Sequence, residues 1–294
     1  MKPVAIVATV CLYAAALTCV PAVFGVPSSW TAPFPAFHIA GNLYYVGSQD
    51  LAAYLIVTPQ GDILINSNLE SSVSQIQRSV GSLGFRFRDI KILLISHAHY
   101  DHCAGSAAIL QMTGAKYEVM DADVAVVESG GKSDFQYGAD KSMQFPPAHV
   151  DRTLHDGDTV SLGGAVLTAH VTAGHTRGTT TWTLDEPEAG HLYHVVIVGS
   201  PNVNPGYELV ANSAYPQIAN DYRAGFKVLS GLSCDIFLGA HGSYFGLLEK
   251  YDRWKSGDRE AFIDPAGYHH YVAEREEAFE AELHMQTVRK RPAN

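Results

Sequence analysis

The segment from Ile90 to His102 constrains the fold of this chain more than any other part of the sequence. Its first half, Ile90–Ile95, is apolar apart from Lys91 and predicts a strand buried on both faces. The strand leads directly into the sequence SHAHYDH at positions 96–102. Aspartate and histidine are polar, so four such groups at one strand end cannot enter a core unless they share a partner. The segment therefore predicts a buried strand whose end carries a chemical site.

The four polar residues after the strand are His97, His99, Asp101 and His102. On an extended backbone His97 and His99 point the same way, and Asp101 and His102 follow as the chain turns into a helix. A divalent metal would satisfy all four side chains together, and dense nitrogen and oxygen ligands favour zinc or a neighbouring transition metal. The alternative is a surface loop that is merely rich in histidine.

Two further histidines follow predicted strands later in the chain. His175 lies in a turn flanked by glycine, and His241 comes just after a second buried strand. Either one alone would be an ordinary loop histidine, but with the first four residues they complete two sets of three ligands. Three protein ligands leave an open position, which is typical of catalytic zinc. We expect one metal to bind His97, His99 and His175, and a second to bind Asp101, His102 and His241.

The charge balance argues against nucleic acids and membrane surfaces as partners. Of 294 residues, 20 are Lys or Arg and 30 are Asp or Glu, which gives a formal net charge of −10. Such a chain lacks the long-range attraction for phosphate backbones and anionic lipids that these partners require. We expect a small-molecule substrate and a monomeric protein. The apolar content of 47% excludes a disordered chain.

The first 25 residues have the pattern of a secretory signal peptide. Lys2 precedes an apolar run from Val4 to Val20, and small residues follow it. We expect cleavage near Ala22 or Gly25 and a periplasmic protein with no membrane segment after cleavage; an uncleaved membrane anchor is the alternative. Residues 26–294 are predicted to form a single domain. The two cysteines that remain after cleavage do not make a disulfide scaffold, so stability must come from the core.

Short strands and helices alternate along the rest of the chain. Each half shows strands first, then a helix and a final strand, which suggests two stacked sheets with helices outside. We therefore predict an α/β fold, a four-layer αββα sandwich with two pseudo-symmetric halves. Strands are expected at 43–47, 52–58, 62–66, 90–95, 117–120, 160–162, 165–171, 179–184, 195–198 and 235–238, helices at 71–83, 104–113, 122–128, 215–232 and 271–289, and a long irregular loop at 129–149.

The H-x-H-x-D-H pattern at 97–102, the Gly-His-Thr turn at 174–176 and the late Gly-x-His at 239–241 resemble the metallo-β-lactamase superfamily. The similarity extends from about Trp30 to Tyr268. Within the superfamily the chain is similar to the third subclass, B3, whose second zinc uses Asp-His-His, and the 203–207 stretch also looks like that subclass. The resemblance implies the metallo-β-lactamase fold and two Zn²⁺ ions.

The residue after Gly199 separates the members of the superfamily. Thioesterases, lactonases and nucleases usually have an aspartate there that bridges both metals, and the first β-lactamase subclass has a cysteine, whereas this chain has Ser200. The resemblance therefore implies zinc-dependent hydrolysis of the β-lactam ring of penicillins, cephalosporins and carbapenems by a metal-bound hydroxide, and hence antibiotic resistance. Two alternatives stay open: a metallohydrolase of lactones or thioesters on the same fold, and a periplasmic zinc-binding protein without catalysis.

Further residues take expected roles from the resemblance. Asp101 would orient the nucleophile and help pass a proton to the leaving nitrogen, and Tyr207 would support the developing oxyanion. Ser200 and Asn204 would bind the substrate carboxylate. Asn66 stands where the superfamily commonly has aspartate, so we expect it to support the metal loop without charge. Cys234 is expected to be a buried free thiol, because the position of its usual partner is Tyr268, and Cys103 is expected to be a packing residue.

Overall fold

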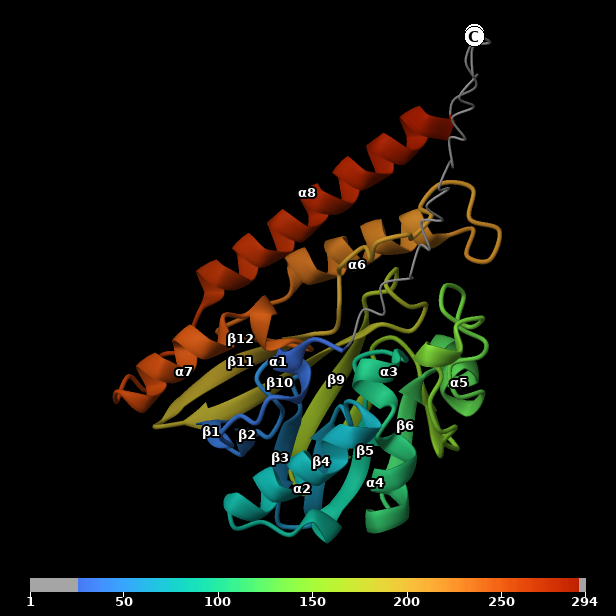
Figure 1. Ribbon diagram of the computed structural model, residues 1–294. Coiled ribbons are helices and arrows are strands. Elements are labelled where there is room, and N and C mark those ends of the chain that lie inside the picture. The colour runs from blue at the N-terminus through green and yellow to red at the C-terminus, as the bar shows by residue number, and fades with distance from the viewer. Residues whose placement is uncertain (1–25, 291–294) are drawn as a thin grey trace, which may run out of the picture.

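The chain folds into two β-sheets that lie face to face, with helices on both outer sides (Figure 1). This is the predicted four-layer αββα sandwich. The computed structural model describes residues 26–290, so the expected signal peptide lies outside the described residues. Within that range, no helix combines the length and the apolar character needed to cross a bilayer.

The first sheet follows the chain order from β1 to β7. The first four strands, β1 to β4, pair antiparallel with their neighbours. From β4 to β7 each strand pairs in parallel with the next. Parallel strands place their carboxyl ends at one edge, and the candidate ligands leave β5 at that edge. The strands are β1 (Phe37–Ala40), β2 (Leu43–Tyr45), β3 (Tyr54–Thr58), β4 (Gly61–Ile65), β5 (Ile90–Leu94), β6 (Lys116–Met120) and β7 (Arg152–Leu154).

Helices α2, α4 and α5 pack on the outer face of this sheet. In α2, Val73, Ile76 and Val80 lie on one side of the helix and are buried against the sheet, as their spacing predicts. Gly84 follows with a φ of +87°, which suits glycine and ends the helix where expected. The helices are α2 (Val73–Ser82), α4 (Ser106–Thr113) and α5 (Asp121–Glu128), with 3₁₀ turns η1 (Glu70–Ser72) and η2 (Phe87–Asp89) beside α2.

The second sheet has the order β12-β11-β10-β9-β8 and is covered by α6 and α8 (Figure 1). Its β11 and β12 pair in parallel with α6 between them in the chain, as β4 and β5 do with α2 in the first half. The two halves are therefore similar. The elements are β8 (Thr159–Leu162), β9 (Ala165–Val171), β10 (Thr180–Glu188), β11 (His191–Val198), α6 (Ile218–Gly231), β12 (Ile236–Gly239), η4 (Gly242–Tyr244), α7 (Leu247–Lys255) and α8 (Pro265–Lys290).

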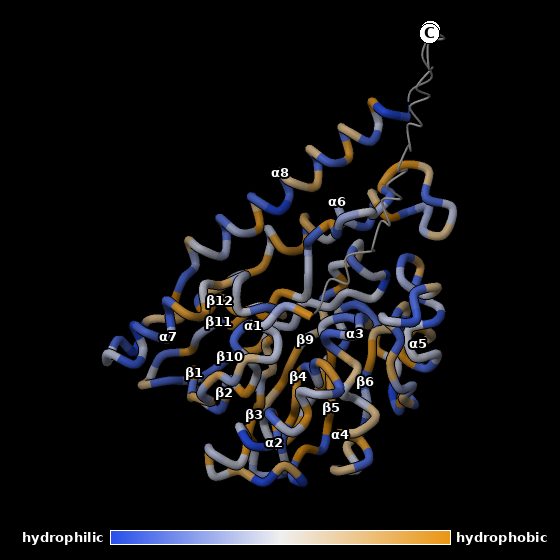
Figure 2. Tube along the Cα trace, viewed as in Figure 1, coloured by the Kyte–Doolittle hydropathy of each residue, from blue (hydrophilic) through white to orange (hydrophobic). Residues whose placement is uncertain are grey.

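The facing sides of the two sheets enclose the main hydrophobic core, and the strands there are largely apolar (Figure 2). Trp182 is 1% exposed and its Nε1 donates a hydrogen bond to the carbonyl of Ile95 at 3.1 Å. The amide of Thr180 donates to the carbonyl of Ser96 at 2.8 Å. These two bonds join β10 to the end of β5, so packing of the sheets fixes where the ligand segment begins.

Several elements differ from the sequence prediction. The strands β10 and β11 form one hairpin that is longer than expected. The mostly polar residues 185–188 of β10 continue the pairing with residues 191–194 of β11. Helix α8 begins at Pro265 rather than at residue 271, since proline suits the first turn of a helix. The loop at 129–149 is irregular as expected except for η3 (Lys141–Met143). The elements without a predicted counterpart include α1 (Ser28–Thr31), β1, β7, α7 and the 3₁₀ turns η2 and η4.

Candidate metal centre

The candidate site begins where β5 ends, and Asn66 holds the backbone there. Asn66 adopts a φ of +67°, lies fully buried and accepts a hydrogen bond from the amide of Ser96 at 2.8 Å. Its Nδ2 donates to the carbonyl of Ala52 at 3.2 Å. The expectation that this residue supports the loop without charge is confirmed, because its contacts are hydrogen bonds to backbone.

The first cluster contains His97, His99 and His175, whose candidate ligand atoms all lie within 4.8 Å of one another. The distance from His99 Nδ1 to His175 Nε2 is 3.1 Å. His175 Nδ1 lies 2.8 Å from the carbonyl oxygen of Asn202, a pure acceptor, so this nitrogen carries the proton. The lone pair of His175 is therefore on Nε2, which faces the cluster.

The second cluster contains Asp101, His102 and His241, and it lies beside the first. The short helix α3 (Tyr100–Cys103) places Asp101 and His102 side by side, with 3.3 Å between Asp101 Oδ2 and His102 Nε2. His241 Nε2 lies 3.1 Å from His102 Nε2 and 3.6 Å from Asp101 Oδ2. His97 also lies within reach of Asp101 and His102, so it stands between the two clusters.

The donor atoms of these clusters fit metal ions. His97 has a buried ring nitrogen, Nε2, without a hydrogen-bond partner. His99 and His102 face the clusters with Nδ1 and Nε2, respectively. Burial, together with the neighbouring imidazoles, holds the pKa of His97 well below its ordinary value, so the ring is neutral and keeps a lone pair. Burial lowers the pKa of His99 to about 4. Neutral imidazoles and a carboxylate are the ligand types that zinc prefers.

Two carboxylates stay ionised here: Asp101 in the second cluster and Asp50 beside it. Burial opposes ionisation of Asp101, but His102 and His241 outweigh it and hold its pKa well below the ordinary value. Burial likewise opposes ionisation of Asp50, but hydrogen bonds from His241 and Ser243 lower its pKa to about 2. Asp50 Oδ2 lies 3.1 Å from His241 Nδ1, which orients the ring so that Nε2 faces the cluster.

The sequence analysis did not identify Asp123, which joins the two loops that carry the first cluster. It is buried in the first turn of α5 and accepts hydrogen bonds from the amides of Ala98 at 2.8 Å and Gly178 at 2.9 Å. The hydroxyl of Thr176 donates a third bond at 2.8 Å. Burial raises the pKa of Asp123 to about 6. An acidic residue at a helix start is an ordinary surface feature, so only the tertiary structure reveals this function.

A cavity of about 360 Å³ opens over both clusters. This volume suits a small organic molecule. Trp30 and Tyr244 form an aromatic wall beside His241, with ring centroids 5.6 and 5.0 Å from the imidazole. Loop residues from the 129–149 segment form the opposite side. The lining includes Trp30, Asp50, His99, Asp101, Asp134, Tyr137, Met143, Phe145, His175, Asn202, Asn204, His241, Ser243 and Tyr244.

The expected substrate residues differ in their access to this cavity. Asn204 lines it, and its Nδ2 donates to the hydroxyl of Tyr137 at 3.0 Å. Ser200 is 1% exposed and its hydroxyl lies 3.0 Å from that of Tyr244, outside the lining. Tyr207 is also buried, and its hydroxyl donates to the carbonyl of His175 at 2.8 Å.

Ser200 and Tyr207 both lie outside the residues that line the cavity, and their hydroxyl groups bond to Tyr244 and to the backbone of His175. Their expected functions at the substrate stay predictions. Sequence patterns indicate that such residues lie near the site but not which way the hydroxyl points.

Both cysteines in the described range are buried free thiols, as expected. Cys103 Sγ donates to the carbonyl of His99 at 3.1 Å and packs below the ligand segment. Burial raises the pKa of the Cys103 thiol well above its ordinary value and that of Cys234 to about 12, so neither is a reactive thiolate. Tyr268, at the position of the missing disulfide partner, donates its hydroxyl to the carbonyl of Leu229 at 2.6 Å.

Curated relatives match about half of the chain. A probable metallo-hydrolase of Burkholderia pseudomallei (strain 1710b) is 29% identical over 164 residues, which cover 54% of this chain and 53% of that protein. A hydroxyacylglutathione hydrolase of Jannaschia sp. (strain CCS1) is 28% identical over 130 residues, which cover 44% of this chain and 41% of that protein. The chain thus spans about half the length of the curated relatives it matches.

Solved structures match much more of the chain. The native FEZ-1 metallo-beta-lactamase from Legionella gormanii is 56% identical, with a TM-score of 0.87 and coverage of 87% of this chain and 98% of that chain. BJP-1, a subclass B3 metallo-beta-lactamase of Bradyrhizobium japonicum, is 34% identical, with a TM-score of 0.84 and coverage of 90% and 98%. The sequence profile of the metallo-beta-lactamase superfamily matches residues 52–188, which include five of the six candidate ligands. With two histidine-rich clusters at the ends of its strands and near-complete coverage of such relatives, this chain belongs to the metallo-beta-lactamase superfamily.

Proposed function

We propose that this protein is a zinc-dependent β-lactamase that opens the lactam ring of penicillins, cephalosporins or carbapenems and so confers antibiotic resistance. The observation that carries the proposal is the pair of adjacent three-residue clusters beneath a cavity of about 360 Å³. Support comes from the 56% identity to the FEZ-1 metallo-beta-lactamase, which the chain covers almost completely.

Six side chains would hold two zinc ions. His97, His99 and His175 would bind the first ion, and Asp101, His102 and His241 the second. Bound zinc would supply Lewis-acid chemistry and would lower the pKa of a bound water to about 7, so that the nucleophile is available at neutral pH. The support for this assignment is that the ring nitrogens of buried histidines converge with an ionised carboxylate.

The reaction adds water across the amide bond of the lactam. The carbonyl carbon gains an oxygen, the C–N bond breaks, and the nitrogen gains a proton. The ionised carboxylate of Asp101 lines the cavity and would orient the water and pass its proton toward the nitrogen. Asn204 would bind the substrate carboxylate through its amide, and Tyr137 fixes the orientation of that amide. Asn204 and Tyr137 are partly buried, and there one hydrogen bond to a substrate is worth more than in water.

A second candidate activity is hydrolysis of lactones or thioesters. The specific observation in its favour is the partial similarity to a hydroxyacylglutathione hydrolase. Against it stands Ser200, whose hydroxyl is bonded to Tyr244 where thioester hydrolases of the superfamily usually have a bridging carboxylate. A zinc-binding protein without catalysis is the remaining alternative.

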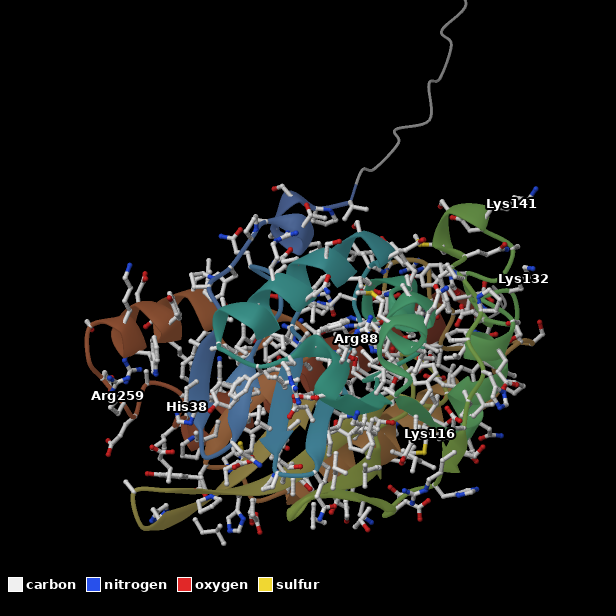
Figure 3. The ribbon with its side chains drawn as sticks, turned by 90° about the horizontal axis from the view of Figure 1, so that it is seen from below. His38, Arg88, Lys116, Lys132, Lys141 and Arg259 are labelled. Carbon is white, nitrogen blue, oxygen red and sulfur yellow. The ribbon has the colours of Figure 1, made fainter. Side chains whose placement is uncertain are left out.

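The location and partners of the protein also belong to this proposal. We propose export to the periplasm through the signal peptide at residues 1–25, and a monomer that acts on a small molecule and binds neither nucleic acid nor membrane. The formal charge of −10 supports the choice of partner. Basic side chains are dispersed: Figure 3 labels some of them on separate elements, such as Lys116 on β6 and Arg259 after α7.

Turnover of a carbapenem by the purified protein, with and without a metal chelator, tests the proposal. We expect hydrolysis that the chelator abolishes and added zinc restores, with two zinc ions per chain by elemental analysis. An acyl lactone and a thioester in parallel assays would show little turnover. His241→Ala should lose most of the activity, whereas His149→Ala, which removes an exposed imidazole far from the cavity, should not. Absence of stoichiometric zinc, or faster lactone than carbapenem turnover, would contradict the proposal.

A further inference from the structure

The segment between β11 and α6, residues 199–217, forms one wall of the cavity although it contains neither helix nor strand. Its backbone groups therefore have no sheet or helix ladder to satisfy them. Tyr207 and Leu209 are 2% and 4% exposed, so their amide and carbonyl groups need partners inside the protein. The amide of Tyr207 bonds within the segment, to the carbonyl of Asn204, whereas the carbonyl of Tyr207 and the amide of Leu209 bond to a side chain of another element.

Gln286 on α8 supplies the partners for both residues. Its Oε1 accepts a hydrogen bond from the amide of Leu209 at 2.7 Å, and its Nε2 donates to the carbonyl of Tyr207 at 2.8 Å. One planar amide thus pairs with the carbonyl before Glu208 and the amide after it. A neighbouring strand in a sheet would bond to the same two groups. Glu282, one turn earlier on α8, accepts the second proton of Nε2 at 2.8 Å and fixes the orientation of the amide.

The clamped residues connect directly to the candidate site. The hydroxyl of Tyr207 donates to the carbonyl of His175 at 2.8 Å, and the amide of Tyr207 donates to the carbonyl of Asn204 at 3.1 Å. A shift of the Tyr207 backbone would therefore move a candidate zinc ligand and a candidate substrate contact together. Lys290 adds a bond from Nζ to the carbonyl of Val210 at 2.6 Å, but it is partly exposed, whereas Gln286 is buried.

We propose that Gln286 is a positioning residue that holds the 202–210 segment in the geometry that binds the substrate carboxylate. It acts through Tyr207 on Asn204 and has no contact with the substrate, since it does not line the cavity. Its kinetic consequence rests on the proposed β-lactamase function. Its structural consequence, the order of the segment, does not depend on that function.

Gln286→Met separates the hydrogen bonds from packing, because methionine has a similar length and no amide. Gln286→Glu keeps an acceptor for Leu209 but loses the donor to Tyr207. The matched control is Gln217→Met, the same replacement at an exposed glutamine in the same segment, whose side-chain partner is the exposed Asn220. Each protein is assayed with a chromogenic cephalosporin, zinc is quantified, and amide hydrogen exchange of residues 204–212 is measured by mass spectrometry.

We expect Gln286→Met to raise the KM about 5- to 20-fold, with kcat changed less than about threefold and zinc content unchanged. Amide exchange across 204–212 should accelerate by about tenfold or more. Gln286→Glu should accelerate it at least as much, because its second carboxylate oxygen would face the carbonyl of Tyr207 and the carboxylate of Glu282. Gln217→Met should leave both measurements unchanged.

Two results would overturn the inference: exchange in 204–212 that stays at the wild-type rate in Gln286→Met, or a fall in kcat equal to the rise in KM. Accelerated exchange in a protein that hydrolyses no β-lactam would show that the clamp exists and that the proposed function fails. The two failures can therefore be told apart. If Gln286→Met does not fold, exchange in Gln286→Glu decides the outcome.

Discussion

Asp50 accepts a hydrogen bond from His241 across the top of the cavity, with 3.1 Å between Oδ2 and Nδ1. The two residues are 191 positions apart in the chain and meet because β12 lies next to the turn that follows β2. The carboxylate fixes which ring nitrogen carries the proton and leaves Nε2 toward Asp101. A partly buried charge on Asp50 thus supports a candidate ligand of the second zinc.

Replacing Asp50 with alanine should weaken zinc binding at the second cluster. Loss of a carboxylate that orients a ligating histidine typically costs 10- to 100-fold in metal affinity, and we expect about that loss here. Competition with a chromophoric chelator measures it. The first cluster should keep its affinity, and Asp258→Ala, an exposed carboxylate paired with Arg253, serves as the control. An affinity of the second cluster that stays at the wild-type value in Asp50→Ala would contradict this function of Asp50.

Asp123→Ala should destabilise the protein and separate the two loops of the first cluster. The change leaves the buried amides of Ala98 and Gly178 without partners, and we expect a loss of about 2–4 kcal/mol in the free energy of unfolding. Urea unfolding of the zinc-free protein measures it. Asp121→Ala is the matched control, because Asp121 is exposed in the same first turn of α5. A loss no larger than in the control would show that these bonds contribute little.

Gly174→Ala should destabilise the folded protein for two separable reasons, one in the backbone and one in the packing. Gly174 has a φ of +133°, and a Cβ there would lie 2.5 Å from the ring of Tyr222. We expect a loss of about 2–4 kcal/mol in stability, together with weaker zinc binding, because His175 is the next residue. Gly190→Ala supplies the control, since it has a φ of +82° and open space around it, and should lose only about 1 kcal/mol. Thermal unfolding of both variants gives the comparison, and equal losses would rule out the contact with Tyr222.

The raised pKa of Glu186 predicts that the free energy of unfolding falls as the pH rises from 4.5 to about 7. Burial, with the neighbouring charges of Asp185 and Glu188, raises its pKa from an ordinary 4.5 to about 7, although it accepts a bond from the amide of Asn42 at 3.0 Å. The folded state therefore binds this proton more tightly than the unfolded state, so stability is lost as the pH rises through this window. Glu186→Gln removes the titration and keeps an acceptor for Asn42.

The comparison for Glu186 uses urea unfolding at pH 5 and pH 8. Relative to the wild type, Glu186→Gln should gain about 1–2 kcal/mol more at pH 8 than at pH 5, after allowance for solvent screening. The control is Glu70→Gln, which changes an exposed carboxylate in η1 and should give the same difference at both pH values. If the change in unfolding free energy caused by Glu186→Gln is the same at both pH values, the raised pKa of Glu186 is refuted.

The sequence by itself determined the class of fold and the identity of the candidate ligands. The apolar run of β5, the glycine that ends α2 and the dense histidines at 97–102 are local patterns, and local patterns depend on residues that are neighbours in the chain. The contribution of Asn66, which hydrogen-bonds the residue before His97, was expected from the resemblance to the superfamily, which commonly has aspartate at this position.

Only the tertiary structure decided how side chains from distant elements are used. The hydroxyls of Ser200 and Tyr207 turn to Tyr244 and His175 rather than to the cavity, and Asp123 joins two loops that are far apart in the chain. Gln286 satisfies backbone groups in a segment without regular structure. These outcomes depend on which buried donors and acceptors meet when the two sheets pack. Each such group must find a partner there, and no local pattern specifies which one it finds.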